Sequence, residues 1–219
     1  METEDLRLTI YGTFATTGRP PNLAHLAVKF VADPEELRKR LDELAAARHV
    51  VLDADGEIVM AHPFSAVPLG FSVMGREALW WGGCAWDAFA LPALLADEPD
   101  VLVATRCPGC DRPHAWVVGR SAPPEGSQVA HFLIPAARIW QDVVRSCGHQ
   151  RIFCSAQCVD TWLARTGNAR GYVMDLATLW RLARHWYDGR LERGYTRREP
   201  AEAAAYFREV GLTGPFWGN

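Results

Sequence analysis

The sequence lacks several features that would assign whole classes of function. No uninterrupted apolar run approaches the roughly 20 residues that a membrane-spanning helix needs. The first ten residues, METEDLRLTI, carry early acids and no long apolar stretch, so we expect no secretory signal peptide. A net charge of −3 provides no strong attraction for nucleic acid or an anionic membrane. We therefore expect a cytoplasmic protein with no membrane partner, for which nucleic acid is a disfavoured partner.

Cysteine is absent from the first 80 residues. Six cysteines follow, namely Cys84, Cys107, Cys110, Cys147, Cys154 and Cys158. In a reducing cytoplasm such residues are thiols or metal ligands more often than disulfides. The 219 residues are 49% hydrophobic and 22% charged, which is typical of a globular protein with a substantial core. This length suits one large domain, or one domain with a small appendage.

The pattern of apolar and capping residues over 1–62 predicts a small helical unit. Apolar residues recur at helical spacing over 5–17 and 23–31, and a third helix begins where Asp33 can cap it and Pro34 can occupy its first position. Its apolar face carries Leu37, Leu41 and Leu44. The following stretch, VVLDADGEIVMAHP, predicts a hairpin about an Asp-Gly turn. Together these elements resemble a winged helix, and we favour a structural cap over a DNA-binding unit because the segment is not strongly basic.

Residues 63–219 alternate short strands with helices. Two strands are predicted around Gly75, and three more within 100–110, 114–120 and 128–135. Helices are predicted over 81–96, 136–144, 155–167, 175–191 and 200–211. The predicted fold class is α+β, with the winged-helix-like helical unit followed by a strand-rich mixed α/β domain.

The segment WGGCAWDAFALPALLA places a thiol and a carboxylate at the start of a helix. Cys84 and Asp87 are three residues apart and therefore share one helix face. Gly82 and Gly83 allow a close backbone approach or a sharp turn before the cysteine. A helix N-terminus is expected to lower the pKa of Cys84. On spacing alone, the favoured explanation is a buried cysteine that only packs, beside an aspartate that complements the helix dipole.

A second segment, VRSCGHQRIFCS, places Cys147 in a predicted loop. With LWWGGCAWDAFALPALL, it resembles the organomercurial (alkylmercury) lyase family, in which a W-x-x-C-A-x-D-x-x-x-x-P-A-L pattern opens a helix and a later cysteine precedes a histidine. The resemblance implies that residues 63–219 form the catalytic domain, with Cys84, Asp87 and Cys147 as catalytic residues that also hold the Hg(II) product. It implies a small organomercurial substrate, no organic cofactor, and a mercuric reductase as acceptor of Hg(II).

Elementary chemistry supports this set of side chains. Soft thiolates are the natural ligands of a soft metal, and two of them on mercury stabilise the departing Hg(II). A carboxyl group beside them can carry a proton from a thiol to carbon. Two cysteines and one aspartate therefore suffice to protonate a carbon–mercury bond.

Four cysteines lie outside this set. Cys107 and Cys110, and Cys154 and Cys158, form two pairs with the spacing of zinc ligands. A structural zinc, a mercury relay and plain reduced thiols all remain open, and His114 or His149 could add a ligand. If Cys147 joined this cluster, the chain would be a metal-binding protein without lyase activity. A metal-sensing winged-helix regulator is a further alternative.

Overall fold

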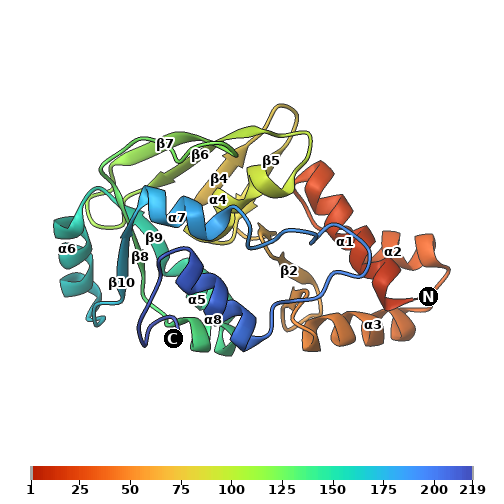
Figure 1. Ribbon diagram of the computed structural model, residues 1–219. Coiled ribbons are helices and arrows are strands. Elements are labelled where there is room, and N and C mark those ends of the chain that lie inside the picture. Colours follow the sequence, from red (N-terminus) through yellow and green to blue (C-terminus); the bar gives the residue numbers. More distant parts are fainter. Residues whose placement is uncertain (1, 219) are drawn as a thin grey trace.

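The computed structural model describes residues 2–218 and contains the three N-terminal helices that the sequence predicts (Figure 1). They are α1 Thr3–Thr17, α2 Leu23–Phe30 and α3 Pro34–Ala46. The Asp33 side chain caps α3 by accepting hydrogen bonds from the amides of Glu35 and Glu36, both at 2.9 Å. The three predicted leucines of α3 are buried. Helix α3 therefore forms from a cap, a proline at its first position and one apolar stripe.

A seven-stranded antiparallel sheet dominates the fold, with strand order β1-β2-β3-β5-β4-β6-β7. The strands are β1 Val51–Leu52, β2 Ile58–Ala61, β3 Phe64–Ser65, β4 Phe71–Met74, β5 Leu79–Gly82, β6 Asp100–Arg106 and β7 Pro113–Gly119. The predicted hairpin is present as β1 and β2, and Val51 pairs with Met60. Because β2 also pairs with β3, the hairpin is continuous with the larger sheet. The winged-helix likeness and the division at residue 62 stay predictions.

Helix α4, Ala85–Leu94, lies between the large sheet and helix α7, Leu176–Ala183 (Figure 1). Eight of its residues are buried, which explains why its sequence is apolar on every side rather than striped. A second sheet, of order β10-β8-β9, lies beyond it. Its strands are β8 Val129–Phe132, β9 Gln150–Phe153 and β10 Tyr172–Asp175. The fold is α+β, as predicted.

Several predicted elements differ in extent or type. Residues 136–144 are not one helix, because the 3-10 helix η1, Ala136–Gln141, ends where Asp142 caps a separate helix α5, Val143–Gly148. The long helix predicted over 175–191 ends at Ala183 as α7, and the chain continues in turns. Strands β9 and β10 were missed. Helices α6, Ala156–Thr166, and α8, Pro200–Glu209, are confirmed.

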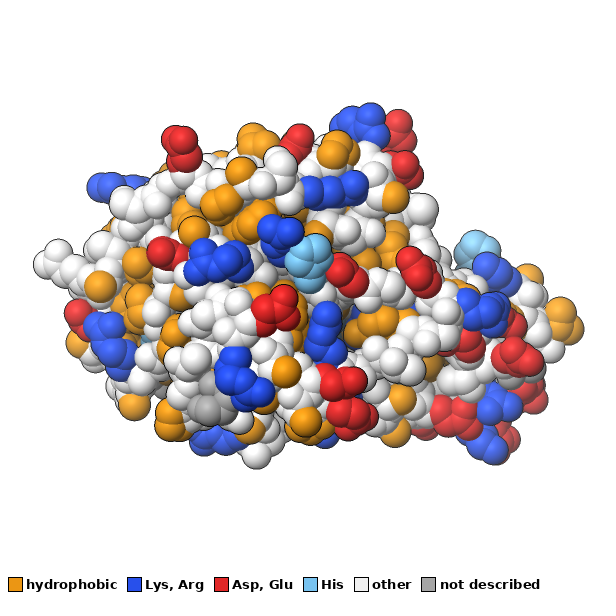
Figure 2. Space-filling model, in the orientation of Figure 1, with side chains coloured by type: hydrophobic (Ala, Val, Ile, Leu, Met, Phe, Trp, Pro, Cys, Tyr) orange, Lys and Arg blue, Asp and Glu red, His pale blue; other side chains and the backbone are white. Residues whose placement is uncertain are grey.

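The surface carries mixed charge. Figure 2 shows basic and acidic side chains interspersed over one face of the molecule. None of the described helices has the length and apolar character needed to cross a membrane.

Candidate functional site

Strand β5 delivers the chain into α4 through two glycines. Cys84 is the N-cap of α4 and Asp87 lies in its first turn. The Cys84 sulfur donates a hydrogen bond to Asp87 Oδ2 at 3.2 Å, so the two side chains meet on one face as the spacing predicted. A Cβ on Gly83 would lie 2.5 Å from the same Oδ2, so this position has room only for glycine. The predicted close backbone approach is therefore present.

Cys147 approaches the same carboxylate from α5. Its sulfur lies 3.9 Å from Asp87 Oδ2, so one oxygen faces both sulfurs. The two sulfurs can be no farther apart than the sum of these distances. The structure thus brings together the three residues that the sequence singled out. The loop predicted around Cys147 is wrong, because the residue lies in the last turn of a short helix.

Two side chains that no sequence pattern indicates complete the contacts. The Tyr187 hydroxyl donates to Asp87 Oδ1 at 2.5 Å, and His62 Nε2 lies 3.4 Å from the Cys147 sulfur. Tyr187 comes from the turns that follow α7, where the sequence predicted a continuous helix. His62 follows β2 directly, and a lone histidine there carries no distinguishing signal. Asp87 therefore has a donor on each oxygen.

The site is shielded from solvent. Cys84, Asp87 and Cys147 are between 1% and 2% exposed. Burial raises the pKa of Asp87 from 3.8 to about 6, against the opposing effect of the Tyr187 hydrogen bond. Burial also raises the pKa of Cys84 well above its usual value. The predicted lowering of the Cys84 pKa by the helix N-terminus is therefore wrong for the free protein, because desolvation outweighs the helix dipole.

The pKa of Cys147 reflects opposing effects. Its hydrogen bond with Cys84 lowers the pKa, whereas desolvation and the nearby Asp87 charge raise it, and the net shift is upward. His62 is neutral, since burial lowers its pKa to about 3. Its Nδ1 atom is buried and has no hydrogen-bond partner among the described residues. A neutral imidazole in the Nε2–H form can donate to a Cys147 thiolate.

A buried arginine lies behind Tyr187. Arg190 is 2% exposed, and its guanidinium donates to the hydroxyls of Tyr11, at 2.7 and 3.0 Å, and Tyr195, at 3.0 Å. The same guanidinium lies over the Tyr187 ring at 5.5 Å. Its positive charge contributes to lowering the Asp87 pKa. The site therefore has a fixed cation close to a carboxyl group of raised pKa.

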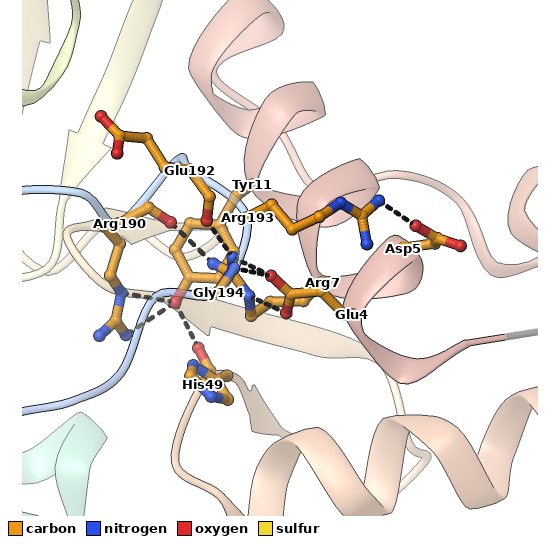
Figure 3. Close-up of polar contacts among 9 residues, drawn as sticks. All are labelled: Glu4, Asp5, Arg7, Tyr11, His49, Arg190, Glu192, Arg193 and Gly194. Atoms are coloured by element: carbon orange, nitrogen blue, oxygen red, sulfur yellow. Dashed lines mark hydrogen bonds and ion pairs between the residues drawn. The ribbon is translucent and has the colours of Figure 1, made fainter.

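The N-terminal helix holds this arginine in place (Figure 3). Tyr11 of α1 accepts from Arg190 and donates to the His49 carbonyl at 2.6 Å. Arg7, one turn earlier, donates to the carbonyls of Arg190 and Glu192 at 2.7 and 2.6 Å. Residues of the N-terminal unit thus support the segment that contains Tyr187.

The tryptophans near the site mainly pack. The ring of Trp86 lies 4.6 Å from that of Trp186 and also neighbours Phe207 and Trp217. The indole nitrogen of Trp80 donates to the Phe14 carbonyl at 2.9 Å, which joins the sheet to α1. Trp81 instead lines a shallow groove with Arg106 and Arg151.

The remaining four cysteines meet at a second place. Their sulfurs all lie within 4.8 Å of one another, and the group is Cys107, Cys110, Cys154 and Cys158. Cys147 is not part of it, so the catalytic candidates and the paired cysteines are separate sets. His114 Nε2 lies 3.2 Å from the Cys154 sulfur, whereas His149 bonds the Arg145 carbonyl.

Comparison with known proteins gives a family match and a structural match. The family model of the alkylmercury lyases (MerB) matches residues 64–188, more than half of the chain. Among solved structures, the crystal structure of the mercury-bound form of MerB2 has a TM-score of 0.64 and 18% sequence identity. The match covers 87% of this chain and 92% of that one, and at this identity it shows a shared fold. No curated protein sequence matches the chain.

Proposed function

Because this chain belongs to the alkylmercury lyase family, we propose that it cleaves the carbon–mercury bond of a small organomercurial with Cys84, Cys147 and Asp87. The observation that carries the proposal is the position of Asp87 Oδ2, which faces the sulfurs of Cys84 and Cys147 at 3.2 and 3.9 Å. A carboxylate there can take a proton from either thiol and hand it to a group bound between them.

The first step is ligand exchange on mercury. A thiol displaces the ligand X from R–Hg–X, giving a cysteine–mercury–R species and HX. Both free thiols have raised pKa values, so each needs a base to become a nucleophile and a metal ligand. Asp87 lies within reach of both sulfurs and serves as that base.

The second step breaks the carbon–mercury bond. The other thiol transfers its proton to Asp87 and its thiolate binds mercury. Protonated Asp87 then gives the proton to carbon, RH departs, and Hg(II) remains held by two thiolates. A pKa of about 6 lets the carboxyl group both accept and release a proton near neutral pH. Overall, R–Hg–X and two thiols yield RH, HX and a bis-thiolate Hg(II).

Tyr187 and His62 support these steps. The Tyr187 hydroxyl fixes one carboxylate oxygen, so that the other faces the sulfurs. His62 lies beside Cys147, where an Nε2–H donor stabilises the thiolate that forms. The cysteines must be reduced for this chemistry, which suits a cytoplasmic location, and a mercuric reductase is a chemically suitable acceptor of the product.

An Asp87→Asn variant tests the proposal. It keeps both thiols and nearly the same volume, so it should still bind Hg(II) while releasing hydrocarbon from an aryl- or alkylmercurial about 10²-fold or more slowly. Asp97→Asn, an exposed aspartate beyond the C-terminus of α4, is the matched control and should keep the parent rate. Gas chromatography of the released hydrocarbon, with Hg(II) stoichiometry measured in parallel, separates the two functions. A parent protein that binds Hg(II) but releases no hydrocarbon would be a metal trap rather than a lyase.

A further inference from the structure

The four cysteines outside the candidate site form a compact group contributed by two separate parts of the chain. Cys107 directly follows β6 and Cys110 lies in the β6–β7 turn, whereas Cys154 follows β9 and Cys158 lies in the first turn of α6. Their sulfurs lie within 4.8 Å of one another, and those of Cys110 and Cys154 are 3.3 Å apart. In a tetrahedral zinc site with Zn–S bonds of about 2.3 Å, neighbouring sulfurs lie about 3.8 Å apart. The group therefore has the dimensions of one metal-binding site.

The backbone around the first pair is shaped to hold this arrangement. The amide of Cys107 donates to the Arg112 carbonyl at 2.9 Å, and that of Asp111 donates to the Cys107 carbonyl at 2.8 Å. Asp111 adopts a left-handed conformation with φ of 61°, which closes the tight turn. A Cβ on Gly109 would lie 2.3 Å from the Cys158 carbonyl oxygen, so this turn needs glycine to approach α6.

The second pair is presented by a capped helix. The Ser155 side chain accepts from the Cys158 amide, which fixes the first turn of α6. The amide of Cys154 points at the Cys107 sulfur at 3.4 Å, a contact that stabilises a thiolate. Arg165 of α6 also donates to the Pro108 carbonyl at 2.5 Å, from the side facing the turn. Both pairs are thus positioned by backbone and cap contacts that do not involve the sulfurs as donors.

Hydrophobic packing at this end of the molecule is limited. The local core is separate from the main one and contains five buried residues, Cys107, Phe153, Val159, Trp162 and Leu163. So small a core rarely stabilises a helix and a hairpin turn by itself, and structural metals commonly supply the remainder. A metal bound here would cross-link the β6–β7 turn to α6.

We propose that Cys107, Cys110, Cys154 and Cys158 bind one structural Zn(II) as a closed tetrathiolate site. Four thiolates complete the tetrahedral coordination of zinc and leave no position for substrate. Hg(II) is held by two thiolates in the proposed lyase product, so it would need only two of these four cysteines as ligands. His114, at 3.2 Å from the Cys154 sulfur, then acts as a neighbour that can donate a hydrogen bond to a bound thiolate.

If the chain acts as the proposed lyase, the four-cysteine site is connected to the candidate active site through strand β9. Strand β9 spans four residues, about 13 Å, with Cys147 before it and Cys154 after it. A zinc ion on Cys154 would anchor the far end of the strand that follows Cys147. The metal would therefore support the position of α5 without touching the substrate.

The first experiment uses the full-length protein purified without chelator. Native mass spectrometry and elemental analysis should find about one zinc per chain. Cobalt substitution should give the intense visible bands of tetrahedral Co(II) and a sulfur-to-cobalt charge-transfer band in the near ultraviolet. A folded protein that contains no zinc and shows four titratable thiols at these positions would overturn the proposal, as would a disulfide between Cys110 and Cys154 found by non-reducing peptide mapping.

Variants assign the metal to this group. Cys110→Ser should reduce the zinc content at least about fivefold, and Cys110→His, which supplies a nitrogen ligand, should restore most of it. Cys84→Ser and Cys147→Ser are the matched controls and should keep about one zinc per chain. Zinc loss in those two variants, with retention in Cys110→Ser, would place the metal at the lyase site and overturn the proposal. Because native mass spectrometry of the parent needs no variant, a variant that fails to fold does not block the test.

Discussion

Tyr187 donates its hydroxyl proton to Asp87 Oδ1 at 2.5 Å, while the other oxygen of the same carboxylate faces two sulfurs. The carboxyl group thus divides its two oxygens between the tyrosine hydroxyl and the two cysteine sulfurs. Desolvation raises the Asp87 pKa and the tyrosine hydrogen bond lowers it, and the balance is a value of about 6. Tyr187 therefore holds one oxygen of Asp87 in place and partly offsets the rise in its pKa that burial causes.

Removing this hydroxyl should shift the pH dependence of turnover. In Tyr187→Phe the Asp87 pKa should rise further, because desolvation would be less strongly opposed. The limb of the pH–rate profile that reports Asp87 should move to higher pH. Because the buried carboxylate oxygen loses its hydrogen-bond donor, the free energy of unfolding should fall by about 1–3 kcal/mol. Hydrocarbon release measured between pH 5 and 9, scanned at about half-unit steps, tests this. Tyr172→Phe, on β10, is the control, and identical profiles for parent and Tyr187→Phe would refute the role.

The raised pKa of Asp87 also predicts a pH-dependent stability. Between the ordinary value of 3.8 and about 6, the folded protein binds more protons at this group than the unfolded chain does. The contribution of Asp87 to stability is therefore fully present below this window and declines as pH rises through it. The rise in the Asp87 pKa from 3.8 to about 6 corresponds to about 3 kcal/mol in the free energy of unfolding.

Asp87→Asn should abolish the part of the pH dependence of stability that comes from Asp87. The difference in free energy of unfolding between Asp87→Asn and the parent should move in favour of the variant from about pH 4 to about pH 8. Urea unfolding at matched pH values measures this difference, since titrating groups that do not interact with Asp87 cancel between the two proteins. A difference that stays constant with pH would mean that Asp87 titrates normally in the folded protein.

The sequence predicted most of the helices and large-sheet strands because their signals are local. Asp33 and Ser155 cap their helices, and Gly167 ends α6 in a left-handed conformation at φ of 68°, as the residue types predicted. The errors concern tertiary context. Residues 184–191 have helical composition but fold as turns, where buried Arg190 bonds Tyr11 from the opposite end of the chain. No local pattern encodes such a contact.

The candidate site could be predicted only in part, because some of its contacts are local in the sequence and others depend on tertiary packing. Cys84 and Asp87 share a helix face, which spacing alone reveals, and the family resemblance added Cys147. His62 and Tyr187 come from segments 25 residues before and 100 residues after Asp87. Their proximity depends on how β2, α4 and the turns after α7 pack. The sign of the Cys84 pKa shift was missed because burial depth cannot be read from a helix N-terminus.

Gly83 is predicted to be essential for the position of Asp87. In Gly83→Ala the added Cβ would lie 2.5 Å from Asp87 Oδ2 and 2.6 Å from Met60 Cε, so the carboxylate must move. Hydrocarbon release should fall about 10²-fold, the scale of losing a positioned general acid, while both cysteines still bind Hg(II). Gly12→Ala in α1 is the matched control, because nothing lies within 4 Å of its added Cβ. Alanine there should stabilise the helix by up to about 1 kcal/mol. Full activity in Gly83→Ala would show that the precise position of the carboxylate is unimportant.

Arg190 is predicted to adjust the charge state of the site from outside it. Burial raises the pKa of Asp87 and lowers that of His62, and the cation of Arg190 opposes the first shift and adds to the second. In Arg190→Met the pKa of Asp87 should rise, so the acid form should persist to higher pH and the rate profile should shift upward in pH. Loss of the hydrogen bonds to Tyr11 and Tyr195 should also cost about 2 kcal/mol of stability.

A stability loss alone would not establish this electrostatic role, so the pH profile is the decisive measurement. Arg193→Met removes an exposed cation that pairs with Asp5, and it should leave the profile unchanged. Arg190→Lys keeps the charge but not the planar hydrogen-bonding group, so it should retain most of the parent profile while losing stability. If Arg190→Met and Arg190→Lys shift the profile equally, the hydrogen bonds rather than the charge set the pKa of Asp87. A shift in Arg190→Met alone would show that the charge of Arg190, which Tyr11 of the N-terminal helix holds, contributes to the pKa of Asp87.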